Sequence, residues 1–94
     1  MPTRVVVRKV KGGKLFRLVY DPTSQRARVS LDGDFFLHPE DSLELLQHHL
    51  EECLRMAEEA SAASYLEGKL EEDGIRIIGM SAADLISALW EARR

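Results

Sequence analysis

The first third of this chain decides its fold, and residues 4–32 read RVVVRKVKGGKLFRLVYDPTSQRARVSLD. Valine-rich and alternating runs in this stretch predict three β-strands, because β-branched and aromatic side chains suit a pleated surface. The three runs are residues 4–10, 15–20 and 26–32. Gly12-Gly13 predicts a tight hairpin turn between the first two strands, and Pro22 lies in a turn before the third. Such short connections favour an antiparallel meander.

Apolar side chains alternate with polar ones along the second and third strands. This period of two predicts a sheet with one buried face and one face that is wet or bound by a partner. The wet face carries three arginines, Arg17, Arg26 and Arg28.

The rest of the chain is predicted to be mainly helical. The expected helices span residues 39–60, 62–73 and 81–93, from apolar side chains that recur at three- and four-residue steps. Pro39 suits the first position of the first helix, and Ser61–Ser64 marks the break before the second. Ser81 and Asp84 resemble a capping box at the start of the third. Residues 75–78 form a brief extended piece or edge strand.

These elements predict an α+β fold, in which two or three helices pack on one face of a three-stranded antiparallel meander. Ninety-four residues, 45% of them hydrophobic, suit one domain over residues 1–94, with residues 1–33 as its strand region. No apolar run approaches the roughly 20 residues of a membrane span, and no signal peptide is evident. A single cysteine excludes an internal disulfide, so we expect a reduced, cytoplasmic protein.

The net charge of -3 hides a strong asymmetry along the chain. Residues 1–30 carry eight basic residues and one acidic residue, whereas residues 31–94 carry five basic and fifteen acidic residues. The basic part could meet nucleic acid, a nucleotide phosphate or an acidic protein surface. Alternatively, a basic sheet and acidic helices attract each other within one fold.

Three groups of residues could carry chemistry, and each has a structural explanation. Lys11–Lys14 could cradle a phosphate, but it lacks the P-loop spacing and suits a hairpin turn. His49 and Cys53 have a metal-ligand spacing, yet no second pair completes a site, and Cys53 lies on the apolar stripe of its helix. Asp34, Glu40 and Asp41 suit acid–base chemistry or magnesium, or else the electrostatics of a helix N-terminus. We therefore assign no catalytic and no metal-binding residue.

The segment between the third strand and the first helix has an unusual composition, with two phenylalanines and a leucine among acidic residues. Adjacent side chains in extended backbone point opposite ways, so Phe35 and Phe36 cannot both easily enter one core. One of them is therefore a candidate for contact with a partner or for lining a pocket.

The string Gly33-Asp34-Phe35-Phe36-Leu37-His38-Pro39-Glu40 resembles the signature of the accessory domain of lipoate–protein ligases. In that family the domain is either the C-terminal part of the ligase or a separate small subunit, as in archaeal two-part ligases. Residues 10–18 are similar to the family's glycine-turn hairpin, and Ile78–Leu85 is similar to its closing helix start. The resemblance spans nearly the whole chain, although residues 56–74 are generic helix.

The resemblance implies a non-catalytic accessory subunit, needed when a separate catalytic subunit activates lipoate to lipoyl-AMP with ATP during protein lipoylation. On this reading the chain is not an enzyme by itself and binds no cofactor alone. It forms a heterodimer with the catalytic subunit, and ATP, Mg and lipoate bind in that complex. Lipoyl-acceptor proteins are indirect partners, and neither nucleic acid nor a membrane is a partner.

The resemblance also implies a partner-binding or active-site-completing loop. Its residues are Gly33, Asp34, Phe35, Phe36, His38 and Glu40. The phenylalanines would supply apolar contact, and the polar members would fix orientation by charge or hydrogen bonds. The basic face of Arg17, Arg26 and Arg28 would meet an acidic patch of the catalytic subunit.

Two other classes of function compete with this interpretation. A nucleic-acid module could bind through the basic strands, with Phe16 and Tyr20 stacking on bases. The acidic net charge and the lack of an RNA-recognition signature argue against this function. A sulfur-transfer scaffold, suggested by the likeness of the implied fold to iron–sulfur scaffold proteins, needs an exposed, activated cysteine. Cys53 in mid-helix does not offer one.

Overall fold

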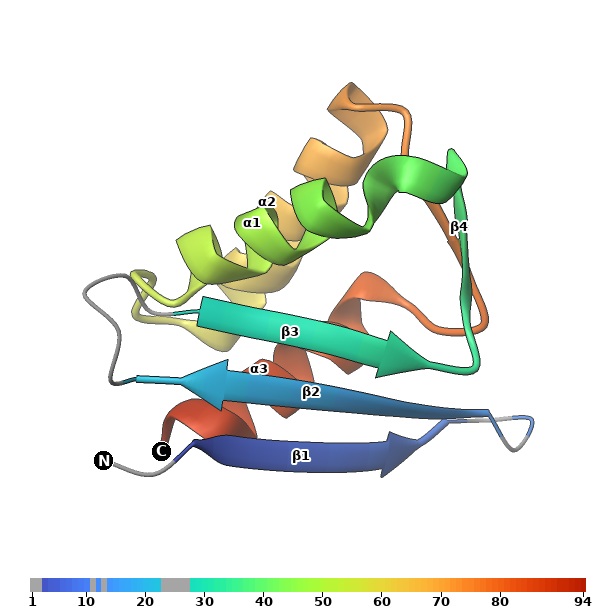
Figure 1. Ribbon diagram of the computed structural model, residues 1–94. Helices are drawn as coiled ribbons and strands as arrows, with labels where there is room; N and C mark the ends of the chain where they lie inside the picture. Colours follow the sequence, from blue (N-terminus) through green and yellow to red (C-terminus); the bar gives the residue numbers. More distant parts are fainter. Residues whose placement is uncertain (1–2, 11, 13, 23–27) are drawn as a thin grey trace.

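A three-stranded antiparallel sheet forms the base of the molecule, and helices cover one of its faces (Figure 1). The structure, a computed structural model, describes residues 3–10, 12, 14–22 and 28–94. In chain order the elements are β1 (Arg4–Lys9), β2 (Leu15–Asp21), β3 (Arg28–Gly33), β4 (Phe36–His38), the 3₁₀ turn η1 (Glu40–Ser42), α1 (Leu43–Cys53), α2 (Glu59–Glu72), β5 (Arg76–Ile78) and α3 (Ala82–Arg93).

The strand order β1-β2-β3 confirms the predicted antiparallel meander, and the whole is the predicted α+β fold. Gly12 has a φ of 95°, as a tight turn requires, whereas Gly13 and most of the second turn lie outside the described residues. The predicted faces are also confirmed. Phe16 and Leu18 are buried, and Arg17 between them is exposed on the helix-free face.

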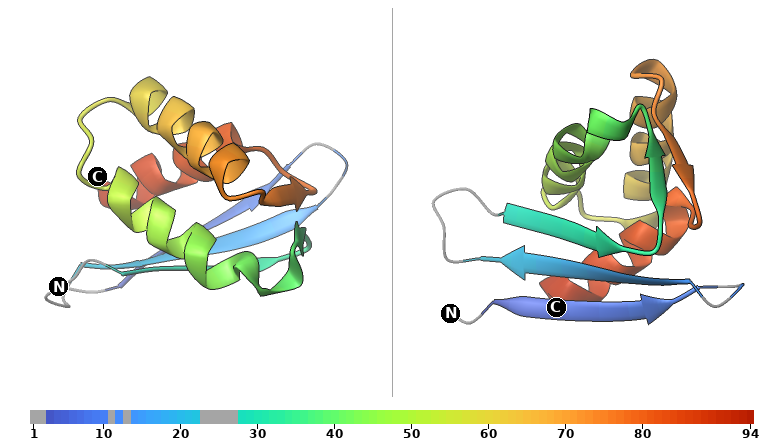
Figure 2. Two further views of the ribbon diagram at one scale, coloured as in Figure 1. Left: turned by 90° about the horizontal axis from the view of Figure 1, so that it is seen from above. Right: turned by 45° about the vertical axis from the view of Figure 1, so that its right-hand side comes forward.

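Each helix contacts the sheet or its neighbours in a different way. α3 lies across β1 and β2, α1 runs beside β3, and α2 packs against both helices (Figure 2). The core between them is apolar and includes Leu46, Leu50, Leu66 and Leu89, which are fully buried. Among the described residues, no helix has both the length and the apolar character needed to cross a membrane.

The boundary between the first two helices differs from the prediction. α1 ends at Cys53 instead of continuing to residue 60, and Ser61–Ser64 lies within α2 instead of breaking it. The chain leaves α1 through bonds of the tighter 3₁₀ type, such as Met56 N to Cys53 O at 3.0 Å. Arg93 of α3 then donates to the carbonyl of Met56 at 2.7 Å, so a contact from the far end of the chain helps to set this boundary.

The segment before α1 also differs from the prediction. Pro39 is extended, with φ -63° and ψ 154°, and precedes a 3₁₀ turn instead of occupying the first position of the α-helix. The predicted extended piece at residues 75–78 does form a strand, β5. It does not extend the meander, however, because it pairs with β4, a strand that was not predicted (Figure 2). The two strands make a separate antiparallel ribbon at one end of the molecule.

Among the described residues, the basic and acidic parts of the chain meet in two ion pairs. Arg8 of β1 contacts Glu91 of α3 at 2.6 Å, and Arg17 of β2 contacts Asp32 of β3 at 2.9 Å. These contacts fit the expectation that the two parts attract each other within the fold. All four side chains are at least one-third exposed, so each pair contributes only about 0–1 kcal/mol to stability.

Candidate functional site

The segment Gly33–Glu40 connects the end of β3 to η1 along one end of the molecule (Figure 1). Its middle part is β4, which pairs with β5 in the register Phe36↔Ile78 and His38↔Arg76. The signature string thus forms a strand that is held by backbone pairing on one side.

Gly33 allows the close approach between the end of β3 and β2. Its φ is 144°, a conformation that side-chain-bearing residues rarely adopt. A Cβ at this position would lie 2.4 Å from the carbonyl oxygen of Leu15 and 2.6 Å from the Cα of Phe16. Only glycine fits this position without a backbone shift.

Asp34 continues the attachment of the segment to β2. Its backbone N–H donates to the carbonyl of Leu15 at 2.7 Å, and its carboxylate accepts from the Leu15 N–H at 3.4 Å. On the other side, Gly79 follows β5, and a Cβ there would lie 3.2 Å from the carbonyl oxygen of Asp34. Asp34 therefore has structural contacts with β2.

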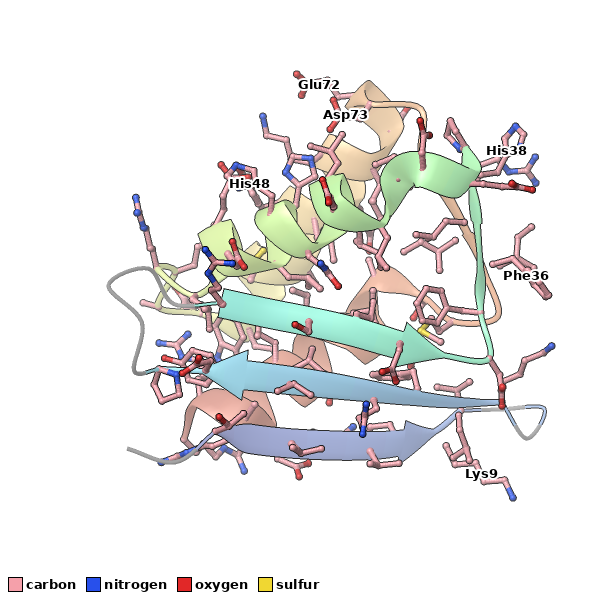
Figure 3. All side chains as sticks on the ribbon, in the orientation of Figure 1. Lys9, Phe36, His38, His48, Glu72 and Asp73 are labelled. Atoms are coloured by element: carbon pink, nitrogen blue, oxygen red, sulfur yellow. The ribbon has the colours of Figure 1, made fainter. Side chains whose placement is uncertain are left out.

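The two adjacent phenylalanines have different environments. Phe35 is partly buried and packs against the hydrophobic core, whereas Phe36 is 67% exposed. Phe36 and His38 project from the outer side of β4, away from the sheet and the helices (Figure 3). The expectation that only one of the two would enter the core is confirmed, and Phe36 is the one left available for a partner.

The outer side of the β4–β5 ribbon forms one continuous face. Cross-strand partners lie on the same side of an antiparallel pair, so Ile78 lies beside Phe36 and Arg76 beside His38. Ile78 is 52% exposed, and the Lys14 ammonium lies 6.0 Å from the centroid of the Phe36 ring. We call these five residues the ribbon face. It combines an apolar pair with cationic or titratable side chains.

Two open hollows flank the exposed phenylalanine. One has a volume of about 420 Å³ and lies between the β1–β2 turn and the segment, where Gly12, Lys14 and Asp34 contribute to its lining. The other has a volume of about 360 Å³ and is lined in part by Leu31 and Leu43. A side chain of a partner could enter either hollow beside the ring.

The two described members of the predicted basic face, Arg17 and Arg28, lie near opposite ends of β3. Arg17 of β2 lies opposite Asp32 of β3 and forms an ion pair with it; Asp32 immediately precedes Gly33. Arg28 is at the opposite end of β3, about 17 Å from Gly33 at the usual rise per strand residue. Arg26 lies outside the described residues. Of the two described arginines of the predicted basic face, only Arg17 lies near the segment Gly33–Glu40.

His49 lies in a contact that the sequence did not suggest. Its side chain is buried, and its Nδ1 and Nε2 atoms lie 2.8 Å from Glu52 Oε1 and 2.6 Å from Asp73 Oδ2. The bond from His49 is the main reason that the pKa of Glu52 lies below its ordinary value. The cluster joins α1 to the C-terminal end of α2.

Cys53 does not join His49 in a metal site. Its thiol is fully buried and lies 3.7 Å from the carbonyl of Ala62, and burial raises its pKa to about 11. Within the described part of the chain, no group of three His, Cys, Asp or Glu side chains has a geometry that could hold a metal ion.

Sequence reasoning missed Lys14, Arg76 and Ile78 as members of the ribbon face. The available signal was the short β-branched run around Ile77, which alternates like a strand and lacks a partner in the meander. Comparisons with protein-family models, curated proteins and solved structures find no match to this chain.

Proposed function

We propose that this chain is a non-catalytic accessory subunit of a lipoate–protein ligase, and that it binds a separate catalytic subunit through the ribbon face. Two lines of support combine. The string Gly33–Glu40 resembles the signature of that family, and within this string Phe36 is 67% exposed. The exposure of Phe36 on a segment that is otherwise firmly attached is the observation that carries the proposal.

An exposed aromatic side chain on a fixed strand is well suited to protein recognition. A phenylalanine has few rotatable bonds and a large apolar surface, so it contributes much binding free energy for little lost conformational entropy. Gly33 and the pairing of β4 with β5 hold the backbone of Phe36 in place before binding. The apolar pair of Phe36 and Ile78 would then form the buried centre of the interface.

The polar members of the ribbon face would orient the partner. His38 and Arg76 lie at one end of the ribbon and Lys14 lies beside the ring of Phe36, so polar and cationic groups border the apolar centre. Charged groups at the rim of an interface mainly increase the association rate and the specificity. We expect carboxylates on the facing surface of the catalytic subunit.

In this proposal the chemistry belongs to the catalytic subunit, which binds ATP, Mg and lipoate. This chain binds beside the active site and helps to order the loops that hold the substrates. A protein that binds only the ordered form of its partner shifts the population toward that form. Activation of lipoate would therefore depend on the accessory subunit although it supplies no reacting group.

The two other functions find less support in the geometry. Base stacking by Phe16 and Tyr20 would require both rings on the helix-free face, but they lie on the face that the helices cover, and Phe16 is buried. Sulfur transfer requires an accessible thiolate, whereas the thiol of Cys53 is buried and its pKa is raised.

The proposal is tested by lipoate- and ATP-dependent release of pyrophosphate from the catalytic ligase subunit of the same organism, with and without this chain. We expect release only when both proteins are present. Phe36→Ala should reduce the release, whereas Leu45→Ala, which removes an exposed apolar side chain of α1, should not. Equal release without this chain, together with the absence of a complex, would reject the proposal.

A further inference from the structure

The β3 edge of the three-stranded sheet is closed by side chains of α1. The N–H of Val29 donates to Glu51 at 2.9 Å, and the N–H of Leu31 donates to Gln47 at 2.9 Å. These amides point away from β2 and would otherwise be available to another strand. A further strand cannot pair at this edge without displacing both side chains.

The opposite edge, along β1, has no such cover in the described part of the chain. The N–H of Val10 donates to the carbonyl of Lys14 on the β2 side. Along an antiparallel strand, residues whose N–H and C=O groups bond to the partner alternate with residues whose N–H and C=O groups point away from it. The outward residues are therefore Val5, Val7 and Lys9. Among the described residues their N–H groups have no hydrogen-bond partner outside the sheet.

The side chains along β1 show which kind of strand would suit this edge. The two outward valines are exposed on the helix-free face, by 55% and 59%. Arg4, Arg8 and Lys9 are cationic, β1 contains no acidic residue, and Glu91 balances only the charge of Arg8. The edge is thus apolar along one face and carries a net positive charge.

We propose that the edge of β1 binds an extended, acidic segment of a partner protein, which adds to the sheet as a fourth strand. Strand addition at an exposed edge derives its affinity from main-chain hydrogen bonds and its specificity from alternate side chains. Here apolar side chains of the segment would cover the exposed valines, and its carboxylates would face the cations. This surface lies on β1 and is distinct from the ribbon face.

A second copy of this chain is a poor occupant because of its charge. If two β1 strands paired antiparallel with Val5 of one opposite Val7 of the other, Arg4 of one chain would lie directly opposite Arg8 of the other. Like charges directly opposite each other destabilise a strand pair. In this register the cations therefore disfavour self-association, and the net positive charge of the edge favours an acidic partner.

The test uses this chain alone and a fluorescent hexapeptide, acetyl-Glu-Glu-Val-Thr-Val-Glu-amide, whose alternation matches β1 in an antiparallel register. The first control peptide carries lysine in place of each glutamate. The second is N-methylated at the amides that would face β1, so that it keeps its charge but cannot donate. From the usual strength of cross-strand charge pairs, the acidic peptide should bind about tenfold more tightly than the lysine peptide, and the methylated peptide should not bind.

Variants of β1 locate the binding. Val7→Pro removes one outward N–H without removing a bond to β2, so it should abolish binding, whereas Val7→Thr should retain it. Lys9→Glu should weaken binding of the acidic peptide several-fold even if the proline variant does not fold. Lys14→Glu changes the same charge in the ribbon face and should leave the affinity unchanged.

Amide resonances of the ¹⁵N-labelled chain give the decisive readout. The proposal expects saturable shifts at Val5, Val7 and Lys9 and none at Val29 or Leu31. It is overturned if the acidic and lysine peptides bind equally well, if neither binds, or if the shifts lie elsewhere. It is also overturned if the same amides shift with protein concentration alone, which would identify a second copy as the occupant. None of these results depends on the ligase subunit, so this inference and the proposed function can fail separately.

Discussion

Replacing Phe35 and Phe36 by alanine, one at a time, should give opposite effects although the residues are adjacent. Phe35 packs against the core, whereas Phe36 projects from the ribbon face. Phe35→Ala should therefore lower stability, and Phe36→Ala should lower affinity for the catalytic subunit. Each variant is the matched control of the other, because the same side chain is removed from neighbouring positions of one strand segment.

The size of each effect follows from the exposed surface. With 67% of the residue exposed, Phe36 offers roughly 130 Å² of surface, which is about 3 kcal/mol if a partner covers all of it. Phe36→Ala should therefore bind the catalytic subunit about 100-fold more weakly. Its free energy of unfolding should change by no more than about 0.5 kcal/mol. A fully buried phenylalanine costs about 3–5 kcal/mol on truncation, so the partly buried Phe35 should cost about 2 kcal/mol.

Two measurements separate the effects. Thermal unfolding followed by circular dichroism should show a midpoint about 8–16 °C lower for Phe35→Ala, given the scaling for a domain of this size, and an unchanged midpoint for Phe36→Ala. Calorimetric titration with the catalytic subunit should show the loss of affinity for Phe36→Ala at a temperature where both variants are folded.

If Phe36→Ala binds the catalytic subunit as tightly as the parent, the ribbon face is not the binding surface. If Phe36→Ala destabilises the chain as much as Phe35→Ala, Phe36 is part of the core. The stability comparison requires only this chain, so it remains informative even if no ligase subunit binds.

Three further predictions concern stability. His49→Ala removes two hydrogen bonds to carboxylates and should lower the free energy of unfolding, measured with urea, by about 3 kcal/mol. His48→Ala, at an exposed neighbouring position, should change it by less than about 0.5 kcal/mol. Equal effects of the two variants would contradict the role of the His49 cluster. The hydrogen bond from His49 lowers the pKa of Glu52, so its contribution to stability is present above the unfolded-state pKa of 4.5 and is lost as the pH falls below it. The difference in unfolding free energy between the parent and His49→Ala should therefore become smaller in acid. A larger difference in acid would contradict this prediction. Gly33→Ala should introduce about 2 kcal/mol or more of strain and lower the midpoint of thermal unfolding by at least about 10 °C. Gly68→Ala, in the interior of α2 where an added Cβ contacts nothing, should raise this midpoint slightly.

Much of the fold was accessible from local patterns. The alternation over residues 15–20 correctly predicted which side chains of β2 are buried, and the strand order followed from the short turns. The capping box at Ser81 and Asp84 is present, with bonds of 2.9 and 3.1 Å. Each of these features depends on residues that are neighbours in the sequence or in one turn.

The candidate site was accessible only in part. The opposite orientation of Phe35 and Phe36 follows from the geometry of extended backbone, and it was predicted. The partner of Phe36 across the ribbon, Ile78, lies 42 positions away in the chain and became evident only from the pairing of β4 with β5. A three-residue strand has too short a pattern to be identified alone, because what stabilises it is its partner strand.

Local sequence patterns were sufficient to predict the class of the fold, the two faces of the sheet and that Phe35 and Phe36 would not both enter the core. Only the packed structure shows that the carboxylate of Asp73 reaches His49 from another element, that Glu51 binds the β3 edge, and that no described residue covers the β1 edge. The physical reason is the range of the interactions. Periodicity reports how each residue relates to its own helix or strand, whereas a hydrogen bond between two elements depends on where packing of the core places them.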